Sequence, residues 1–327
     1  MNIFKNKKVV VLGGGTGSYM VLSHLKNHVD DISAIVNMVD DGGSTGILRD
    51  ELGVLPPGDV RQCLVALSPE TSQLRELFKY RFSEGGLRGH SFGNLFLTAL
   101  EKLGNDFGAA VKTAGELLQI RGRVVPVTLD NVRLRLKTKN GGVIAGEGVI
   151  DKMVFAPKEK PSVFIEPKAT INPEAKKAIK EADLIVIAPG SLHTSTLPAL
   201  LVDGVVKAIK KSKAPVVYVV NMIATKGQTD GYNVHDFINE IEKHGKTNFI
   251  DTVVYNTIRP PKDILDLYAS EDGHWIDINL NKLANSPYRI IGEAMLSESA
   301  LKKGLIRHDG EIVARVITSL LRGDLRV

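Results

Sequence analysis

The chain has 327 residues, enough for two domains or for one large α/β domain with an appendage. Hydrophobic residues make up 43% and charged residues 24%, an ordinary globular composition that excludes disorder, collagen and coiled coil as the main architecture. The net charge is only +5 and aromatic residues are 6%, so the sequence lacks the basic and aromatic surface expected of a nucleic-acid-binding protein.

Cysteine content and apolar runs indicate the compartment. Cys63 is the single cysteine, which excludes an internal disulfide and a cysteine-rich zinc site, and its apolar neighbours predict a packed small hydrophobe. The apolar run at residues 9–12 stops at three glycines and is too short for a signal peptide. No apolar stretch reaches the roughly 18 residues of a membrane span. These features predict a cytoplasmic protein.

Short β-branched runs alternate with helical patterns along both ends of the chain, which predicts parallel strands joined by crossover helices. The strands are continuously hydrophobic because a parallel sheet is buried on both faces. We expect strands at residues 8–12, 32–38, 184–188, 215–221 and 249–255, and helices at about residues 18–28, 173–182, 197–211, 233–244 and 261–269.

Residues 124–149 have a different pattern. Val132, Leu134 and Leu136 alternate with basic residues, and Asn140-Gly141-Gly142 supplies a hairpin turn before residues 143–150. This pattern predicts an antiparallel β appendage at about residues 124–165, with residues 158–161 as its return connection. The expected fold is therefore a single Rossmann-like domain over residues 1–327, a doubly wound three-layer α/β/α sandwich that carries this appendage.

The first candidate ligand loop follows the first expected strand and reads Gly13-Gly14-Gly15-Thr16-Gly17-Ser18. Glycines let backbone N–H groups approach a phosphate, and the N-terminus of the next helix favours an anion. The loop predicts phosphate or dinucleotide binding, with tight packing alone as the alternative. Ser18 replaces the third glycine of the nicotinamide fingerprint, which weakens the case for ordinary NAD binding.

A second glycine turn follows the second expected strand and begins with two aspartates, Asp40 and Asp41. Carboxyl ends of parallel strands face the ligand crevice, so one of them can hydrogen-bond a ribose or hold a cation; a capped polar turn is the alternative. Asp59 pairs with Asp40 as a candidate Mg²⁺ site, since carboxylates and phosphate oxygens are usual Mg²⁺ ligands. Alternatively, Asp59 caps a helix at residues 60–67.

Two further polar loops precede helices. His90-Ser91-Phe92-Gly93-Asn94 offers donors to a ligand, or else Ser91 or Asn94 simply caps the next helix. Pro189-Gly190-Ser191-Leu192-His193-Thr194-Ser195 follows the strand at residues 184–188. The recurrence of such loops at strand carboxyl ends and helix amino ends predicts a shared phosphate-binding crevice. A Walker motif and a G-x-S-x-G nucleophile elbow are both missing.

Together, these motifs resemble the YvcK/CofD-like family over about residues 8–315, and most closely its YvcK branch, the gluconeogenesis factors. The stretch from Asp40 to Glu51 favours that branch. CofD-branch members are transferases that move a phospholactyl group from a guanosine diphosphate-linked donor onto the deazaflavin Fo with Mg²⁺. YvcK-branch members look like cytoplasmic regulators that bind UDP-sugars such as UDP-N-acetylglucosamine and are linked to cell shape, peptidoglycan synthesis and gluconeogenic growth.

The resemblance also implies site residues. Asp40 and Asp59 look like metal ligands for Mg²⁺ beside a bound nucleotide, while Tyr268 suits stacking and Arg307 suits a diphosphate. The implied nucleotide-binding set is Gly13, Gly14, Gly15, Thr16, Gly17, Asp41, Gly42, Gly43, Ser44, His90, Asn94, Gly190, Ser191, Ser195, Asn221, Tyr268 and Arg307. His193 replaces a common Tyr, and Ala224-Thr225-Lys226-Gly227-Gln228-Thr229 replaces the usual T-Q-P-G-E-T, which leaves the sugar and any turnover open.

The preferred function is therefore a nucleotide-sugar-binding regulator, with no residue assigned a catalytic role and with protein partners in cell-wall synthesis. The main alternative is a 2-phospho-L-lactate transferase of the CofD branch. A remoter alternative, an NAD-dependent oxidoreductase, lacks an identifiable acid–base pair for hydride transfer. The identity of the nucleotide and the formation of a homo-oligomer stay open.

Overall fold

The computed structural model describes residues 4–138, 140–154, 161–225, 228–245, 248–270, 273–276, 278, 283 and 286–323. Its centre is a parallel sheet of seven strands within that part of the chain, buried as the continuous hydrophobic runs predict. In spatial order the strands are β12 (Arg289–Glu293), β10 (Thr252–Asn256), β8 (Val216–Val219), β7 (Leu184–Ile187), β1 (Phe4–Gly13), β2 (Val29–Val36) and β3 (Arg123–Pro126).

The strand order reverses at the centre of the sheet. The chain runs from β1 outward through β2 to β3, then returns to pair β7 with the other side of β1 and continues outward to β12. A crevice forms outside the carboxyl ends of the strands at such a switch point, and ligands of doubly wound sheets bind there. The fold class predicted from the sequence is confirmed.

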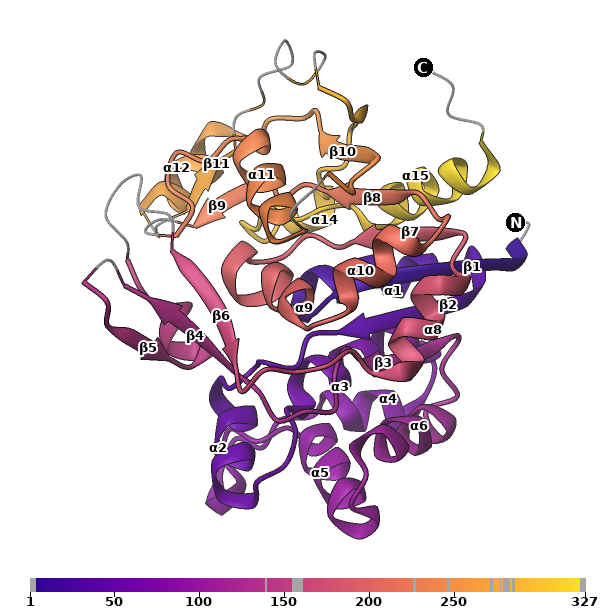
Figure 1. The fold of residues 1–327 in the computed structure, drawn as a ribbon, viewed down its shortest axis with the longest axis vertical. Coiled ribbons are helices and arrows are strands. Elements are labelled where there is room, and N and C mark those ends of the chain that lie inside the picture. Colours follow the sequence, from indigo (N-terminus) through magenta and orange to yellow (C-terminus); the bar gives the residue numbers. More distant parts are fainter. Residues whose placement is uncertain are drawn as a thin grey trace.

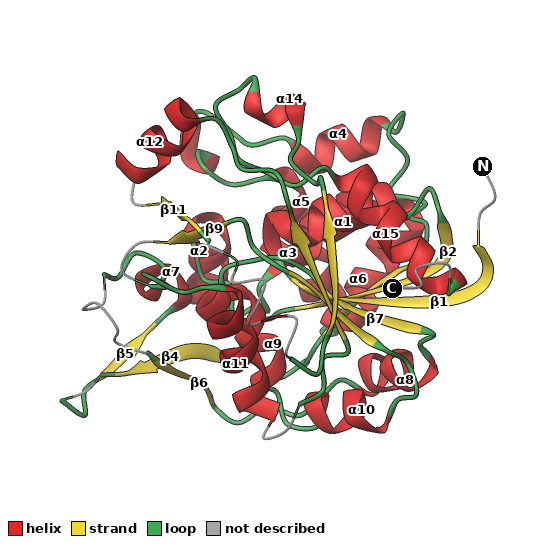
Figure 2. Ribbon diagram, turned by 90° about the horizontal axis from the view of Figure 1, so that it is seen from above, coloured by secondary structure: helices red, strands yellow, loops and turns green. Residues whose placement is uncertain are grey.

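Helices cover both faces of the sheet. In Figures 1 and 2, α1, α3 and α15 lie on one face, and α8 and α10 lie on the other. The helices of the first half are α1 (Gly15–Leu25), α2 (Gly43–Leu52), α3 (Pro57–Leu67), α4 (Gln73–Lys79), the 3₁₀ turn η1 (Gly85–Leu87), α5 (Phe92–Gly104), α6 (Phe107–Leu117) and α7 (Glu147–Ile150). Those of the second half are α8 (Pro173–Glu181), the π-helical turn η2 (Leu192–Thr196), α9 (Leu197–Leu201), α10 (Val205–Lys211), α11 (Val234–Gly245), α12 (Lys262–Ser270), α14 (Glu298–Leu301) and α15 (Gly310–Arg322).

Two small antiparallel sheets lie outside the main one. The first pairs β4 (Arg133–Lys137) with β5 (Val143–Ala145) on one side and β6 (Ser162–Glu166) on the other. It projects beyond the carboxyl ends of the central strands (Figure 1). The second pairs β9 (Ile223–Thr225) with β11 (Gly273–Trp275). The appendage predicted from alternation is thus present beside the crevice.

The boundaries of the appendage differ from the prediction in two places. Residues 123–126 form β3, the edge strand of the main sheet, so the antiparallel part begins at Arg133. The chain also leaves β5 at Gly146, whose φ of +100° turns it into α7. Residues 158–160 of the expected return connection lie outside the described residues.

The helix predicted at residues 197–211 is two helices. Gly204, with φ of +94°, separates α9 from α10, and a Cβ there would lie 2.8 Å from Cγ2 of Ile171. The neighbouring Asp203 exchanges backbone hydrogen bonds with Ala169 and Ile171. A glycine in the left-handed region and a tertiary contact beside it therefore interrupt the predicted helix.

The core lies between the sheet and its helices. Residues such as Val10 and Val186 are almost fully buried, and Cys63 is a fully buried free thiol, as predicted. Burial raises the pKa of that thiol, which keeps it protonated and unreactive. In the described ranges no helix combines the length and apolar character needed to traverse a lipid bilayer.

Candidate functional site

A cavity of about 340 Å³ opens at the switch point between β1 and β7. The loop at residues 14–17 forms one wall, and the loop that follows β7 forms another. Asp40 and Asp59 line it together with Glu147 and Asp151 of the α7 region. We call this space, which backbone loops and carboxylates line, the acidic cavity.

A second cavity of about 230 Å³ adjoins the acidic cavity. The two share Thr16, Gly17, Gly190 and Ser191 in their walls. The remaining lining of the second is mostly apolar, with polar groups from Asn221, Arg307 and His308. We call it the side cavity, and the shared walls make the two cavities one continuous recess.

Two glycines of the first loop are required by close packing. A Cβ on Gly17 would lie 1.7 Å from the carbonyl oxygen of Pro189, and one on Gly14 would lie 2.1 Å from Oδ2 of Asp59. The loop at residues 14–17 and the loop after β7 therefore touch at Gly17, a position that only glycine can occupy. Gly15 and Thr16 begin α1 in the cavity wall, where the first N–H groups of a helix lack intrahelical partners and favour an anion.

Asp59 is the third residue of α3, whose N-cap is Pro56 without a side-chain hydrogen bond. The alternative that Asp59 caps this helix is therefore wrong. Burial, reinforced by the negative charge of Asp40, raises the pKa of Asp59 to about 7, against the opposing effects of the Gly15 N–H and Arg61. Burial also raises the pKa of Asp40, whose Oδ1 accepts a hydrogen bond from the Gly42 N–H at 3.0 Å.

Glu147 adds a further acid to the cavity. Burial and the nearby carboxylates, first among them Asp40, raise its pKa to about 8. In the described part of the chain no three His, Cys, Asp or Glu side chains converge as a ready-made metal cage. Asp40 and Asp59 instead fit the way Mg²⁺ is usually held, by one or two carboxylates with ligand phosphates and water. A cation there would neutralise charge between a diphosphate and these acids.

Asp41 and Ser44 lie outside the walls of both cavities. Oδ1 of Asp41 accepts a hydrogen bond from the Gly148 N–H at 2.8 Å, and its Oδ2 lies 3.5 Å from the Arg133 guanidinium. Asp41 therefore ties the appendage to the loop. Ser44 Oγ lies 2.9 Å from Nδ1 of His90. Between them, Gly42 is the N-cap of α2 and Gly43 its first residue.

The segment at residues 90–94 supports α2, α3 and α5. Ser91 caps α5 by accepting a hydrogen bond from the Asn94 N–H. Asn94 donates from Nδ2 to Ser44 Oγ at 3.2 Å and accepts from Arg61 Nε at 2.9 Å. His90 and Asn94 thus belong to a buried network behind the recess and do not line it. The alternative prediction for this segment, that Ser91 caps the next helix, is correct.

Asn221 holds the second loop in place. Its Nδ2 donates to the Gly190 carbonyl at 2.6 Å, and its Oδ1 accepts from the Gly190 N–H at 3.1 Å. The amide thus fixes both polar groups of the residue that separates the two cavities. Ser191 and Ser195 complete this side of the acidic cavity.

Replacing Asn221 by Ala is expected to weaken the binding of a ligand in the recess about tenfold and to lower the free energy of unfolding by about 1–2 kcal/mol, since it removes two hydrogen bonds. Calorimetric titration and thermal melting measure the two effects. Asn27→Ala serves as control because Asn27 is exposed between α1 and β2, at the opposite edge of the sheet. Equal affinities for the Asn221 and Asn27 variants would contradict the role of Asn221.

Tyr268 and Arg307 lie on the side-cavity flank of the recess. Arg307 lines the side cavity with an exposed side chain. Tyr268, on α12, accepts a hydrogen bond at its hydroxyl from the Ile306 N–H at 3.0 Å and lines neither cavity. The tyrosine therefore positions the backbone next to Arg307.

Sequence reasoning missed several residues of the recess. Glu147 and Asp151 reach it from the appendage, and Asp151 Oδ1 accepts a hydrogen bond from Thr194 Oγ1 at 3.0 Å. No local motif marks these two acids. Gln62 also lines the acidic cavity, and its i, i+3 spacing from Asp59 on one helix is the signal that could have identified it.

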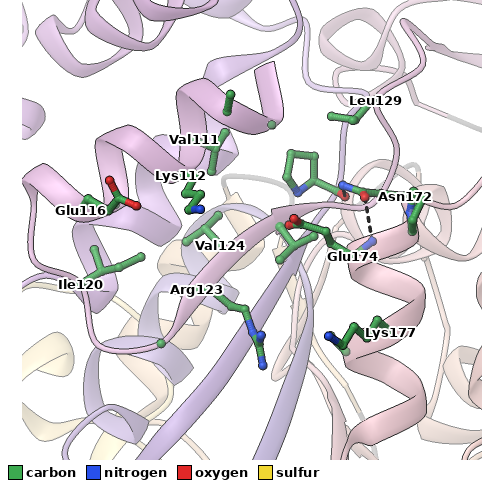
Figure 3. A pocket seen from close by; sticks show the side chains of 18 of the residues that line it. Val111, Lys112, Glu116, Ile120, Arg123, Val124, Leu129, Asn172, Glu174 and Lys177 are labelled. Carbon is green, nitrogen blue, oxygen red and sulfur yellow. Dashed lines mark hydrogen bonds between the residues drawn. The ribbon is translucent and has the colours of Figure 1, made fainter. Parts of the chain in front are cut away.

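A larger cavity, of about 840 Å³, lies elsewhere, along the edge strand β3 between α6 and α8. Figure 3 shows Lys112, Glu116 and Arg123 around it, with Glu174 donating its N–H to the Asn172 side chain at 2.9 Å. None of the ligand loops contributes to its walls. Size alone therefore does not identify the ligand site.

Comparisons with known proteins agree with this architecture. The family model described as 2-phospho-L-lactate transferase CofD matches residues 9–296. The gluconeogenesis factor of Bacillus subtilis (strain 168) is 37% identical over 317 residues, which cover 96% of this chain and 98% of that protein. The gluconeogenesis factor of Listeria innocua is 40% identical over 316 residues, covering 96% and 95%.

Solved structures also match this chain over nearly its whole length. The crystal structure of protein BH3568 from Bacillus halodurans matches with a TM-score of 0.89 at 38% identity, covering 96% of this chain and 100% of that one. A second crystal structure of that protein describes it as a member of the UPF0052 family. With a family model over most of its length and relatives matched nearly end to end, the chain belongs to the CofD/UPF0052 family and is homologous to its gluconeogenesis factors.

Proposed function

We propose that this protein is a cytoplasmic regulator that binds a nucleotide-sugar, a UDP-sugar such as UDP-N-acetylglucosamine, in the recess formed by the acidic and side cavities. Its regulatory roles are in gluconeogenic growth, cell shape and peptidoglycan synthesis, through protein partners in cell-wall synthesis. The observation that carries the binding proposal is the continuity of the two cavities at the switch point of a doubly wound sheet.

The lining of the recess supports a ligand with a phosphorylated centre and two different ends. Loop residues Thr16, Gly17, Gly190 and Ser191 stand where the cavities meet, which suits a diphosphate. The acidic cavity is polar and suits a sugar, whose hydroxyls donate to carboxylates. The side cavity is mostly apolar and suits a base.

The relatives support the physiological part of the proposal, since those from Bacillus subtilis and Listeria innocua are named gluconeogenesis factors. A specific observation favours a second candidate, a phospholactyl transferase with a guanosine diphosphate-linked donor. Asp40 and Asp59 lie together in one cavity and would hold a Mg²⁺ ion, which would supply the charge neutralisation that metal-assisted group transfer requires.

Calorimetric titration with UDP-N-acetylglucosamine, UDP, GDP and NAD, with and without Mg²⁺, tests both candidates. Binding of the UDP-sugar without product formation supports the regulator. Turnover of Fo with a guanosine-linked donor would establish the transferase instead. Arg307→Gln should weaken UDP-sugar binding about tenfold by removing a charged donor, whereas Arg121→Gln, at an exposed position two residues before β3, should not.

A further inference from the structure

The side cavity contains a histidine whose hydrogen bonding fixes its tautomer. Nε2 of His308 lies 3.0 Å from the carbonyl oxygen of Val220, at the end of β8. A carbonyl oxygen only accepts hydrogen bonds, so Nε2 must carry the proton of this bond. The second ring nitrogen, Nδ1, is then the atom that determines what the ring offers to a ligand.

His308 is neutral at physiological pH. Burial lowers its pKa to about 4, with the Val220 carbonyl opposing the shift and the positive charge of Arg307 adding to it. With Nε2 protonated and the ring uncharged, Nδ1 carries a lone pair and is a hydrogen-bond acceptor. Nδ1 has no hydrogen-bond partner among the residues that the structure describes, and this nitrogen is accessible to solvent.

The remaining walls of the side cavity suit a flat ring. Met20, Met222, Ile223 and Ile306 provide apolar surface around a volume of about 230 Å³. That is the scale of one ring system, since drug-sized ligands fill pockets of roughly 300–1,000 Å³. Asn221, an amide side chain in the same wall, already uses both of its polar atoms in hydrogen bonds with Gly190. A histidine with a fixed tautomer therefore lines an apolar cavity beside the loops at residues 14–17 and 189–195.

We propose that His308 selects the base of the bound nucleotide by accepting a hydrogen bond at Nδ1 from a ring N–H, which uracil has at N3 and guanine at N1. The inference rests on nucleotide binding in the recess, as proposed above. Cytosine at N3 and adenine at N1 present lone pairs in the corresponding positions, so each would set two acceptors against each other. His308 thus admits UDP or GDP and disfavours CDP and ADP.

Titration of the native chain with UDP, CDP, GDP, ADP and the diphosphate of N3-methyluridine tests this directly. UDP should bind at least about tenfold more tightly than CDP and N3-methyl-UDP, because either analogue would cover Nδ1 of His308 without giving it a hydrogen-bond donor. The affinity for GDP shows whether the N1–H of guanine serves as the donor as well as the N3–H of uracil. Comparable affinities for UDP and N3-methyl-UDP would overturn the proposal without any variant.

Two substitutions assign the discrimination to the imidazole. His308→Phe keeps a ring but removes both nitrogens, so UDP and N3-methyl-UDP should bind with nearly equal affinity. His308→Gln can still donate to Val220 from its amide and accept from the ligand at Oε1, and it should retain most of the discrimination. Full discrimination by a folded Phe variant would contradict the assignment.

The failure of this inference is distinguishable from failure of the proposed function. A chain that binds no nucleotide contradicts both. A chain that binds UDP and N3-methyl-UDP equally retains its nucleotide site but loses the role of His308. If the Phe variant fails to fold, the comparison of UDP, CDP and N3-methyl-UDP on the native chain still decides.

Discussion

Gly17→Ala is expected to weaken nucleotide-sugar binding by about a hundredfold or more while leaving most of the fold in place. The added Cβ would lie 1.7 Å from the Pro189 carbonyl oxygen, a backbone atom, so one of the two loops must move. These loops form the shared wall of both cavities, and misplacing a binding group by about 1 Å is enough to lose such factors. Calorimetric titration measures the affinity, and circular dichroism reports the fold.

Gly104→Ala is the matched control. Gly104 ends α5, and nothing lies within 4 Å of an added Cβ. This variant should bind normally and gain up to about 1 kcal/mol of stability from the better helix propensity of Ala. Gly15→Val, the substitution that the loop motif suggests first, is less selective because Gly15 has φ of +61°, where any side chain strains the backbone. Native affinity in a folded Gly17→Ala protein would contradict the loop arrangement.

Asp59→Asn is expected to stabilise the metal-free protein at alkaline pH and to abolish any Mg²⁺ dependence of nucleotide binding. The folded-state pKa of Asp59 is about 7 against 3.8 for the free carboxyl, so between these values the folded chain binds more protons than the unfolded chain. The stability from this group is therefore complete below pH 3.8 and is lost as the pH rises through 7. Glu147, with a pKa raised to about 8, acts in the same direction.

Melting temperatures between pH 4 and pH 9 without metal measure this effect. The Asn variant should show a flatter profile and gain on the order of 1 kcal/mol above pH 7, since a pKa unit is worth about 1.4 kcal/mol and partial exposure to water discounts the full shift. Asp41→Asn should instead lower the free energy of unfolding, because it weakens the ion pair with Arg133 and the hydrogen bond from the Gly148 N–H. Parallel profiles for native and Asp59→Asn protein would refute the raised pKa, and an unchanged Mg²⁺ response would refute the shared cation.

The central sheet and the loops at its carboxyl edge could be predicted from the sequence. Runs such as residues 184–188 are short, β-branched and continuously hydrophobic, as a strand buried on both faces is, and glycine loops follow them. The break at Gly204 has a local signal in the Asp203-Gly204 pair, but the backbone pairing between Asp203 and a distant segment that holds it has none. Long-range contacts of this kind leave no local pattern.

The direction of site side chains was predictable only in part. Asp40 and Asp59 reach one cavity as their positions suggested, but Asp41, the next residue after Asp40, turns toward the appendage and binds Gly148. Glu147 and Asp151 enter the same cavity from the appendage. Which of two adjacent carboxylates faces the recess depends on how the appendage packs, and nothing in the local sequence encodes that packing.

A crystal structure of the protein with UDP-N-acetylglucosamine and Mg²⁺ tests most directly whether the two cavities form one nucleotide-sugar site. We expect the diphosphate against the loop at residues 14–17 and beside Gly190 and Ser191, with the base next to His308 and the cation between the phosphates and Asp40 and Asp59. Ligand density in the larger cavity along β3 shown in Figure 3, or a recess left empty at saturating ligand, would contradict the proposal that the two cavities form one nucleotide-sugar site.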